Sequence, residues 1–116
     1  ISVIMGVYNQ NDEKVLREAV DSILNQTFKD FEFIIYDDGS QPDAALILEK
    51  IKKIDPRIVL IGQEKNHGLA FSLNACIEQA RGKYIARMDA DDISDPNRLK
   101  VQYDFLEKNP QYRWCG

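Results

Sequence analysis

Polar and acidic side chains follow three strand-like apolar runs of this sequence, at the points where the runs end. Tyr8-Asn9 follows the first run, Asp37-Asp38 the second, and Asp89-Ala90-Asp91-Asp92 a later one. Carboxylates that gather in one place repel one another, so such a cluster is costly unless a cation neutralises it. Oxygen ligands without His or Cys suit a hard cation, Mg²⁺ or Mn²⁺. The residue types therefore predict a divalent-cation site, provided that the three runs end at one edge of the fold.

Each of these motifs also has a purely structural interpretation. Asp37-Asp38-Gly39-Ser40, taken alone, fits an ordinary turn as well as a ligand site. His67 is the only histidine and is expected in a turn, and Asp95 is expected to cap a helix. The two acids of Asp89-Ala90-Asp91 point the same way only if the segment stays extended, and Arg87 is an ion-pair candidate beside them.

The elements that must position these residues alternate between strand and helix patterns. We expect strands at residues 2–8, 31–36, 58–61, 84–88 and 112–116, and helices at residues 13–25, 43–54, 69–80 and from residue 96 toward Pro110. Asn11 or Asp12 is expected to cap the first helix. This alternation predicts an α/β fold with a mainly parallel sheet flanked by helices. The carboxyl ends of the strands, where ligands bind in such folds, then lie on one edge.

One face of the third expected helix is apolar at helical spacing. The residues on it are Leu69, Leu73, Cys76, Ile77 and Ala80, and they mark a helix that is expected to end at Gly82. Cys76 is accordingly interpreted as a small buried hydrophobe rather than a reactive thiol.

Composition limits the classes of protein to which the chain can belong. Its 116 residues suggest one domain or part of one, and 44% hydrophobic residues suffice for a packed core. No apolar run approaches the roughly 18 residues of a membrane span. The net charge of −4 argues against binding to a nucleic-acid backbone. Two cysteines, Cys76 and Cys115, indicate neither a disulfide framework nor a metal site and fit a reducing cytoplasmic compartment.

Several short motifs follow one another in order along essentially the whole chain. They are Ser2-Val3-Ile4-Met5 with Tyr8-Asn9, Ser22-Ile23-Leu24-Asn25-Gln26-Thr27-Phe28, Phe31-Glu32 with Asp37-Asp38-Gly39-Ser40, Asn66-x-Gly68, Gly82-Lys83-Tyr84-Ile85, Asp89-Ala90-Asp91-Asp92 and Pro96-x-Arg98-Leu99. Together they resemble the opening of family 2 glycosyltransferases with the Rossmann-like GT-A fold. On this resemblance, residues 1–116 are the N-terminal, nucleotide-sugar-binding part of a glycosyltransferase domain.

The resemblance implies an inverting, metal-dependent transfer from a UDP-sugar to a saccharide or lipid-linked saccharide acceptor. Tyr8 and Asn9 would lie against the base, and Asp38 would accept a hydrogen bond from the uracil ring N–H. Asp89 and Asp91 correspond to the family's DxD motif and would be the metal ligands, with Asp89 facing the ribose and Asp91 holding Mn²⁺ or Mg²⁺ on the diphosphate. A metal there stabilises, as a Lewis acid, the charge that develops on the departing diphosphate.

The chain departs from the family pattern at three places. Gly6 and Val7 stand where the family often has Pro and a small residue, and Gly6 is expected to let the backbone approach the base. Ser72-Leu73-Asn74 replaces a stretch that often contains Arg, which puts a diphosphate contact from that helix in doubt. The family's general base is expected after Gly116, so residues 1–116 alone are expected to be inactive; within them, Asp92 is the first alternative candidate.

Other functions compete with this interpretation. A sugar nucleotidyltransferase would need a basic phosphate loop after the first strand, whereas no basic residue precedes Lys14 here. A phosphoacceptor signalling domain would need a lone acid rather than an acidic cluster, and a non-catalytic nucleotide-binding domain is a further alternative. No nucleic-acid partner is expected. Association of a longer protein with the inner face of a membrane is left open.

Overall fold

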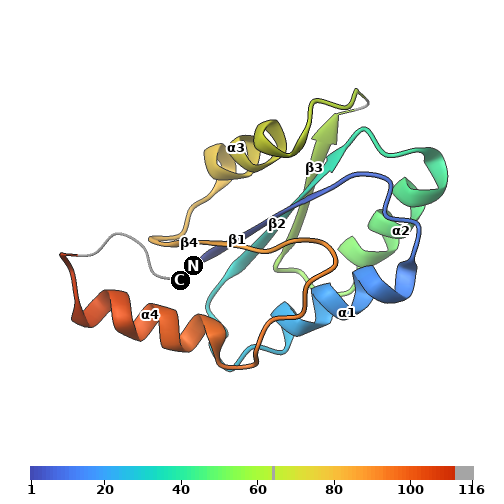
Figure 1. Ribbon diagram of the computed structural model, residues 1–116. Helices are drawn as coiled ribbons and strands as arrows, with labels where there is room; N and C mark the ends of the chain where they lie inside the picture. Colours follow the sequence, from blue (N-terminus) through green and yellow to red (C-terminus); the bar gives the residue numbers. More distant parts are fainter. Residues whose placement is uncertain (64, 112–116) are drawn as a thin grey trace.

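The computed structural model describes residues 1–63 and 65–111. Strands and helices alternate along this range (Figure 1). In chain order they are β1 (Ser2–Val7), α1 (Glu13–Leu24), β2 (Glu32–Asp38), α2 (Pro42–Lys52), β3 (Ile58–Gln63), α3 (Leu69–Gln79), β4 (Ile85–Arg87) and α4 (Arg98–Lys108). The strand expected at residues 112–116, and Cys115 within it, lie outside the described residues.

The four strands form one parallel sheet in the order β3-β2-β1-β4. Val7 is paired with Asp37, and Asp38 with Gln63, so β1, β2 and β3 end level with one another. β4 ends earlier, with Arg87 opposite Ile4. The expected α/β fold is confirmed, and the carboxyl ends of all four strands share one edge.

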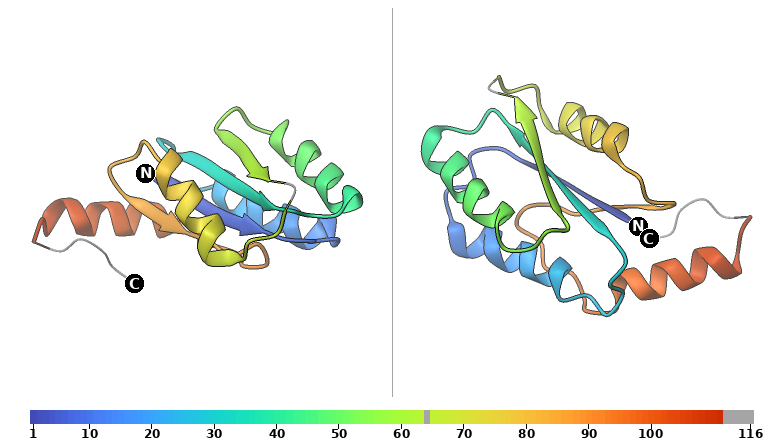
Figure 2. Two further views of the ribbon diagram at one scale, coloured as in Figure 1. Left: turned by 90° about the horizontal axis from the view of Figure 1, so that it is seen from above. Right: turned by 180° about the vertical axis from the view of Figure 1, so that it is seen from behind.

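Helices cover both faces of the sheet, because side chains alternate between the faces along each strand. Phe33 and Ile35 of β2 pack in the larger core beneath α1, α2 and the start of α4. Ile34 and Tyr36 of the same strand face α3, where they pack with Cys76. Figure 2 shows α3 alone on its side, with α1 and α2 on the other.

Helix α1 follows the expectation closely. Its buried residues are Leu16, Ala19, Val20, Ile23 and Leu24, which repeat at helical spacing. Asp12 is the N-cap, since its Oδ1 accepts a hydrogen bond from Val15 N at 3.2 Å. The N-cap residue and the apolar spacing agree with the tertiary packing, so the sequence pattern alone predicts the start and the buried face of α1.

Helix α3 buries only part of its apolar face: Cys76 is buried as expected, and Leu73 and Ala80 pack against its cluster. Ser72 and Cys76 are buried, whereas Leu69 is 47% exposed and Ile77 is 46% exposed. The physical reason is the size of the residues at the contact with the sheet. Ser72 and Cys76 are small and lie four residues apart on one face, which allows the helix to pack close to β1 and β2.

Helix α4 begins two residues later than its sequence signals suggest. Asp95 does not cap the helix; its Oδ1 accepts from Asn97 N at 2.8 Å within a turn that precedes Arg98. The expected start at residue 96 is therefore wrong, because this acid forms a local side-chain turn instead of an N-cap.

Candidate functional site

The loops after β1 and β2 are joined by two hydrogen bonds, and a third lies within the loop after β2. Asn9 has a left-handed backbone (φ 51°); its N donates to Ser40 Oγ at 3.0 Å, and its Oδ1 accepts from Gln41 N at 2.7 Å. Ser40 N donates to Asp37 Oδ1 at 2.9 Å. Asn9 is thereby fixed between the loops, while the neighbouring Tyr8 side chain is 52% exposed at the same edge.

Asp38 is the last residue of β2 and is 3% exposed. Its carboxylate accepts hydrogen bonds from His67 N and Gly68 N, both at 2.8 Å, and from Asn66 Nδ2 at 3.0 Å. A buried carboxylate needs such donors, and these are charge-assisted bonds. Asp38 therefore holds the loop at residues 66–68, which we call the 66–68 turn, against the end of β2, and His67 lies in this loop outside any helix or strand.

An aromatic cluster behind this turn was missed by sequence reasoning. The His67 ring lies 4.4 Å from that of Phe71, and Phe71 meets Tyr36 edge-on at 6.1 Å between ring centroids. Burial, with smaller contributions from Asp38, Cys76 and Asp37, raises the pKa of the Tyr36 hydroxyl. These side chains support the turn from the α3 face of the sheet.

The acids after β4 lie in a turn and not in an extended segment. Met88 N still donates to Ile4 O at 2.9 Å, which keeps the segment beside β1, but Asp92 N then donates to Asp89 O at 3.2 Å. Asp89, Asp91 and Asp92 are all exposed. The condition under which the two acids of Asp-x-Asp would point the same way is therefore not met, because the chain turns immediately after β4. Arg87 is an ion-pair partner as expected, with Nη2 3.4 Å from Asp89 Oδ1.

The acidic turn fits a metal that is shared with a ligand. Within the described part of the chain, no three His, Cys, Asp or Glu residues come together as a metal site. Mg²⁺ is commonly bound by one or two carboxylates while water and substrate phosphates complete its coordination. Asp89 and Asp91 carry carboxylate oxygens of this kind on exposed side chains.

Gly6 has a packing role that differs from the one expected. A Cβ atom at this position would lie 3.0 Å from Leu69 Cδ1 and 3.1 Å from Ser72 Cβ. The close neighbour of Gly6 is therefore helix α3. In the structure this glycine makes room for α3, the helix that follows the 66–68 turn. An approach of its backbone to a base stays a prediction.

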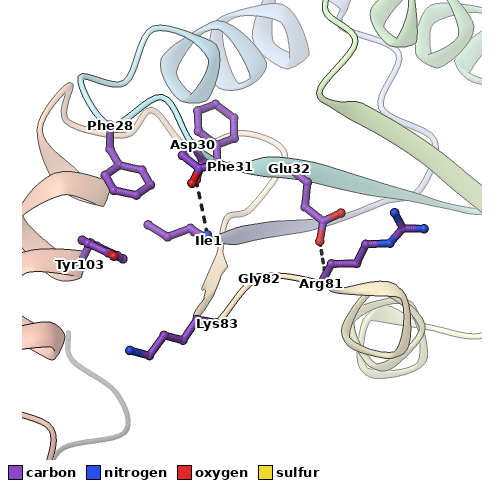
Figure 3. Close-up of a pocket in the computed structure, with 9 residues that line it drawn as sticks. All are labelled: Ile1, Phe28, Asp30, Phe31, Glu32, Arg81, Gly82, Lys83 and Tyr103. Carbon is purple, nitrogen blue, oxygen red and sulfur yellow. Dashed lines mark hydrogen bonds between the residues drawn. The ribbon is translucent and has the colours of Figure 1, made fainter.

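A cavity of about 460 Å³ lies at the opposite edge of the sheet (Figure 3). Its lining comes from the starts of β1 and β2, the loop before β4, and α4: Ile1, Phe28, Asp30, Phe31, Glu32, Arg81, Gly82, Lys83 and Tyr103. None of the predicted site residues is among them. A smaller pocket of about 390 Å³ at the carboxyl edge is lined by Asp37 and Ser40 among others. The acidic and polar residues at the carboxyl ends of the parallel strands therefore favour that edge, rather than the larger cavity, as the ligand site.

Comparison with known proteins shows the family to which the chain belongs. The model of glycosyl transferase family 2 matches residues 2–115. The chain belongs to glycosyl transferase family 2. An uncharacterized glycosyltransferase of Methanocaldococcus jannaschii is 46% identical over 110 residues, which are 94% of this chain and 38% of that relative. The chain therefore spans well under half the length of this relative.

Two solved structures share the fold. The S. aureus protein TarS (residues 1–349), in complex with UDP-GlcNAc, aligns with a TM-score of 0.82 and 28% identity, over 94% of this chain and 31% of that one. The Pyrobaculum calidifontis mannosyltransferase PcManGT, in complex with GDP-Man and Mn²⁺, aligns with a TM-score of 0.79 and 22% identity, over 90% of this chain and 31% of that one. The likeness to PcManGT shows the fold alone.

Among residues 1–63 and 65–111, no helix is both long enough and apolar enough to cross a membrane.

Proposed function

We propose that this chain binds a UDP-sugar and a divalent cation at the carboxyl edge of its sheet, as the donor half of an inverting glycosyltransferase. The observation that carries the proposal is that the acidic turn follows β4, where Met88 N still donates to Ile4 O of β1, and that Tyr8 and Asp38 stand at the carboxyl ends of β1 and β2 in the same parallel sheet. Membership of glycosyl transferase family 2 supports transfer of a sugar. The likeness to TarS, described in complex with UDP-GlcNAc, supports UDP as the nucleotide.

Each residue has a distinct task in this proposal. The exposed Tyr8 ring offers a surface for the base, beside an Asn9 backbone fixed by Ser40 and Gln41. Asp38 places the 66–68 turn and presents its remaining acceptor capacity to the uracil N–H. Asp89 and Asp91 would hold Mg²⁺ or Mn²⁺ against the diphosphate, where the cation supplies Lewis-acid stabilisation of the leaving group.

The proposal assigns deprotonation of the acceptor to sequence outside residues 1–116. General-base catalysis typically contributes about 10²–10⁴-fold, and alignment of the acceptor contributes further. The acids of the carboxyl edge are already assigned to the nucleotide, the cation or their own loops, which leaves Asp92 as the first alternative base. We therefore expect residues 1–116 to bind the donor without transferring sugar to a saccharide or lipid-linked saccharide acceptor.

A thermal-shift comparison of UDP, ATP and acetyl phosphate, each with Mn²⁺ and with EDTA, tests the nucleotide assignment. A ligand that binds only the folded state raises the unfolding temperature. We expect the largest increase with UDP and Mn²⁺. A larger increase with ATP would favour a different nucleotide chemistry, and an increase with acetyl phosphate alone would point to a phosphoacceptor domain.

A further inference from the structure

The segment between β4 and α4 carries the acids but has little support of its own. Across the acidic turn itself the backbone bond is the one from Asp92 N to Asp89 O, at 3.2 Å. The pair formed by Arg87 and Asp89 is long and exposed, and exposed pairs contribute little to order. Fixed placement of the turn must therefore come from groups that hold the two ends of the segment.

One set of holding groups lies at the carboxyl end of α1, about 70 residues away in sequence. The Gln26 side chain is 0% exposed, and its Nε2 donates to Asp95 O at 2.6 Å and to Ser22 O at 2.9 Å. Its Oε1 accepts from Leu99 N at 3.0 Å. Ser22 Oγ accepts from Ser94 N at 3.0 Å. Residues at the end of α1 thus hydrogen-bond to the part of the β4–α4 segment that leads into α4.

The second holding group is Arg98, the first residue of α4. Its Nη2 donates to Arg87 O at 2.8 Å, and its Nη1 donates to Ser94 Oγ at 3.1 Å. Ser94 Oγ in turn donates to Met88 Sδ at 2.9 Å. The planar guanidinium therefore joins the last residue of β4 to the first residue of α4 and closes the intervening segment into a loop.

We infer that Gln26 and Arg98 are positioning residues that fix the acidic turn for the metal-bound diphosphate. This inference rests on the proposed function. The hydrogen bonds of both side chains go to backbone and hydroxyl groups on either side of the acids. Arg98 also lines a pocket of about 320 Å³ that Asp92 shares. Groups behind metal ligands typically change metal affinity by about 10–100-fold when they are replaced, because they set the orientation of the ligands. Ligands on an exposed turn depend on such support more than ligands on a rigid strand do.

The test uses Arg98→Lys, which keeps the charge but loses the two-pronged bridge, and Gln26→Met, which keeps the length but loses the amide. Arg17→Lys is the matched chemical control, since Arg17 pairs with Asp21 on the exposed face of α1. Leu48→Ala on α2 is the control for loss of stability alone, since Leu48 is buried in the core. For each protein, UDP affinity is measured with Mn²⁺ and with EDTA, and bound Mn²⁺ is counted by electron paramagnetic resonance.

We expect Arg98→Lys and Gln26→Met to reduce the Mn²⁺-dependent gain in UDP affinity by about tenfold or more, with UDP affinity in EDTA unchanged. Both controls should keep the full gain. If either positioning variant is less stable but retains the full gain, the residue serves stability alone and the inference is overturned for it. If Gln26→Met does not fold, Arg98→Lys decides the question.

Amide hydrogen exchange separates this inference from the proposed function. Exchange at residues 89–92 should be faster in Arg98→Lys than in the unchanged protein or in Arg17→Lys, because local opening of the turn becomes easier. Unchanged exchange would overturn the inference whatever the ligand is. Absence of any Mn²⁺ effect on UDP binding in the unchanged protein would instead refute the proposed function.

Discussion

The number of hydrogen bonds that a carboxylate can accept governs what Asp38 can do. An ionised carboxylate offers about four acceptor sites, and Asp38 uses three of them on Asn66, His67 and Gly68. The fourth has no hydrogen-bond donor among the described residues, and on the proposed function it would accept from the uracil N–H. A role in uracil recognition and a role in placing the turn are therefore compatible in one side chain, and a substitution there changes both.

Asp38→Asn should both destabilise the fold and weaken UDP binding. The amide keeps one acceptor oxygen and directs an NH₂ group at backbone donors, so at least one buried N–H loses its partner, at a cost of about 1–3 kcal/mol. Urea denaturation measures the loss in free energy of unfolding. Asp37→Asn is the control, since Asp37 is only partly buried and accepts one loop N–H, from Ser40. Equal stability of Asp38→Asn and the unchanged protein would contradict the assigned role.

At the scale of elements, the distance between α3 and β1 is set by small residues. Gly6 lies under Leu69 and Ser72, and the turn held by Asp38 leads directly into the same helix. The position of α3 therefore determines where the 66–68 turn meets the carboxyl edge. Contact between helix and sheet is in this way linked to the shape of the candidate site.

Gly6→Ala should destabilise the protein by about 1–3 kcal/mol, because the added methyl group meets α3 at 3.0–3.1 Å. The cost should be smaller in a Leu69→Ala background, which removes one of the two contacts. A double-mutant cycle with urea unfolding measures this coupling. Equal costs in both backgrounds would show that α3 does not press on this position.

Elements whose local signals agree with their packing could be predicted from the sequence. The cap and buried face of α1, the order of strands and helices, and the placement of the acids after a strand are examples. The burial of Ser72 in α3 could not, because it depends on Gly6, a residue more than 60 positions away. The start of α4 was misjudged because Asp95-Pro96 is equally suited to the turn it forms. Gln26 lies within a motif of the sequence, but its contacts with Asp95 and Leu99 require the tertiary structure.

At the scale of the whole molecule, two carboxylates link stability to pH. Hydrogen bonds from the Arg57 side chain and then from its backbone N–H lower the pKa of Asp55 below 3.8. Burial alone would raise the pKa of Glu32, but hydrogen bonds from Ser2 and Arg81 outweigh it and the pKa falls below 4.5. Glu32 connects Ser2 with Arg81. Asp55 pairs with Arg57, whose side chain also reaches Lys29 O and Leu24 O. Both carboxylates lie at the amino edge of the sheet, away from the proposed ligand site.

The free energy of unfolding should therefore fall as the pH drops below the ordinary pKa values of Glu32 and Asp55. A carboxyl group with a lowered pKa in the folded state binds protons more readily when unfolded, so its stabilisation is complete above about pH 5 and is lost in acid. Urea unfolding between neutral and acidic pH measures the slope. Asp55→Asn and Glu32→Gln should each lessen the acid loss while they lower stability at neutral pH. If the dependence of the unfolding free energy on pH is unchanged in both variants, these two carboxylates are not the source of the acid loss.

The claim on which the whole account depends is that the acidic turn holds a cation against the diphosphate of UDP. Isothermal titration calorimetry of UDP with Mn²⁺ and with EDTA tests it on the unchanged protein, on Asp91→Asn and on Asp104→Asn. Asp104 is the control, an exposed acid on α4 that pairs with Lys100. We expect Mn²⁺ to strengthen UDP binding in the unchanged protein and in Asp104→Asn, but not in Asp91→Asn. Undiminished Mn²⁺-dependent binding by Asp91→Asn would contradict it.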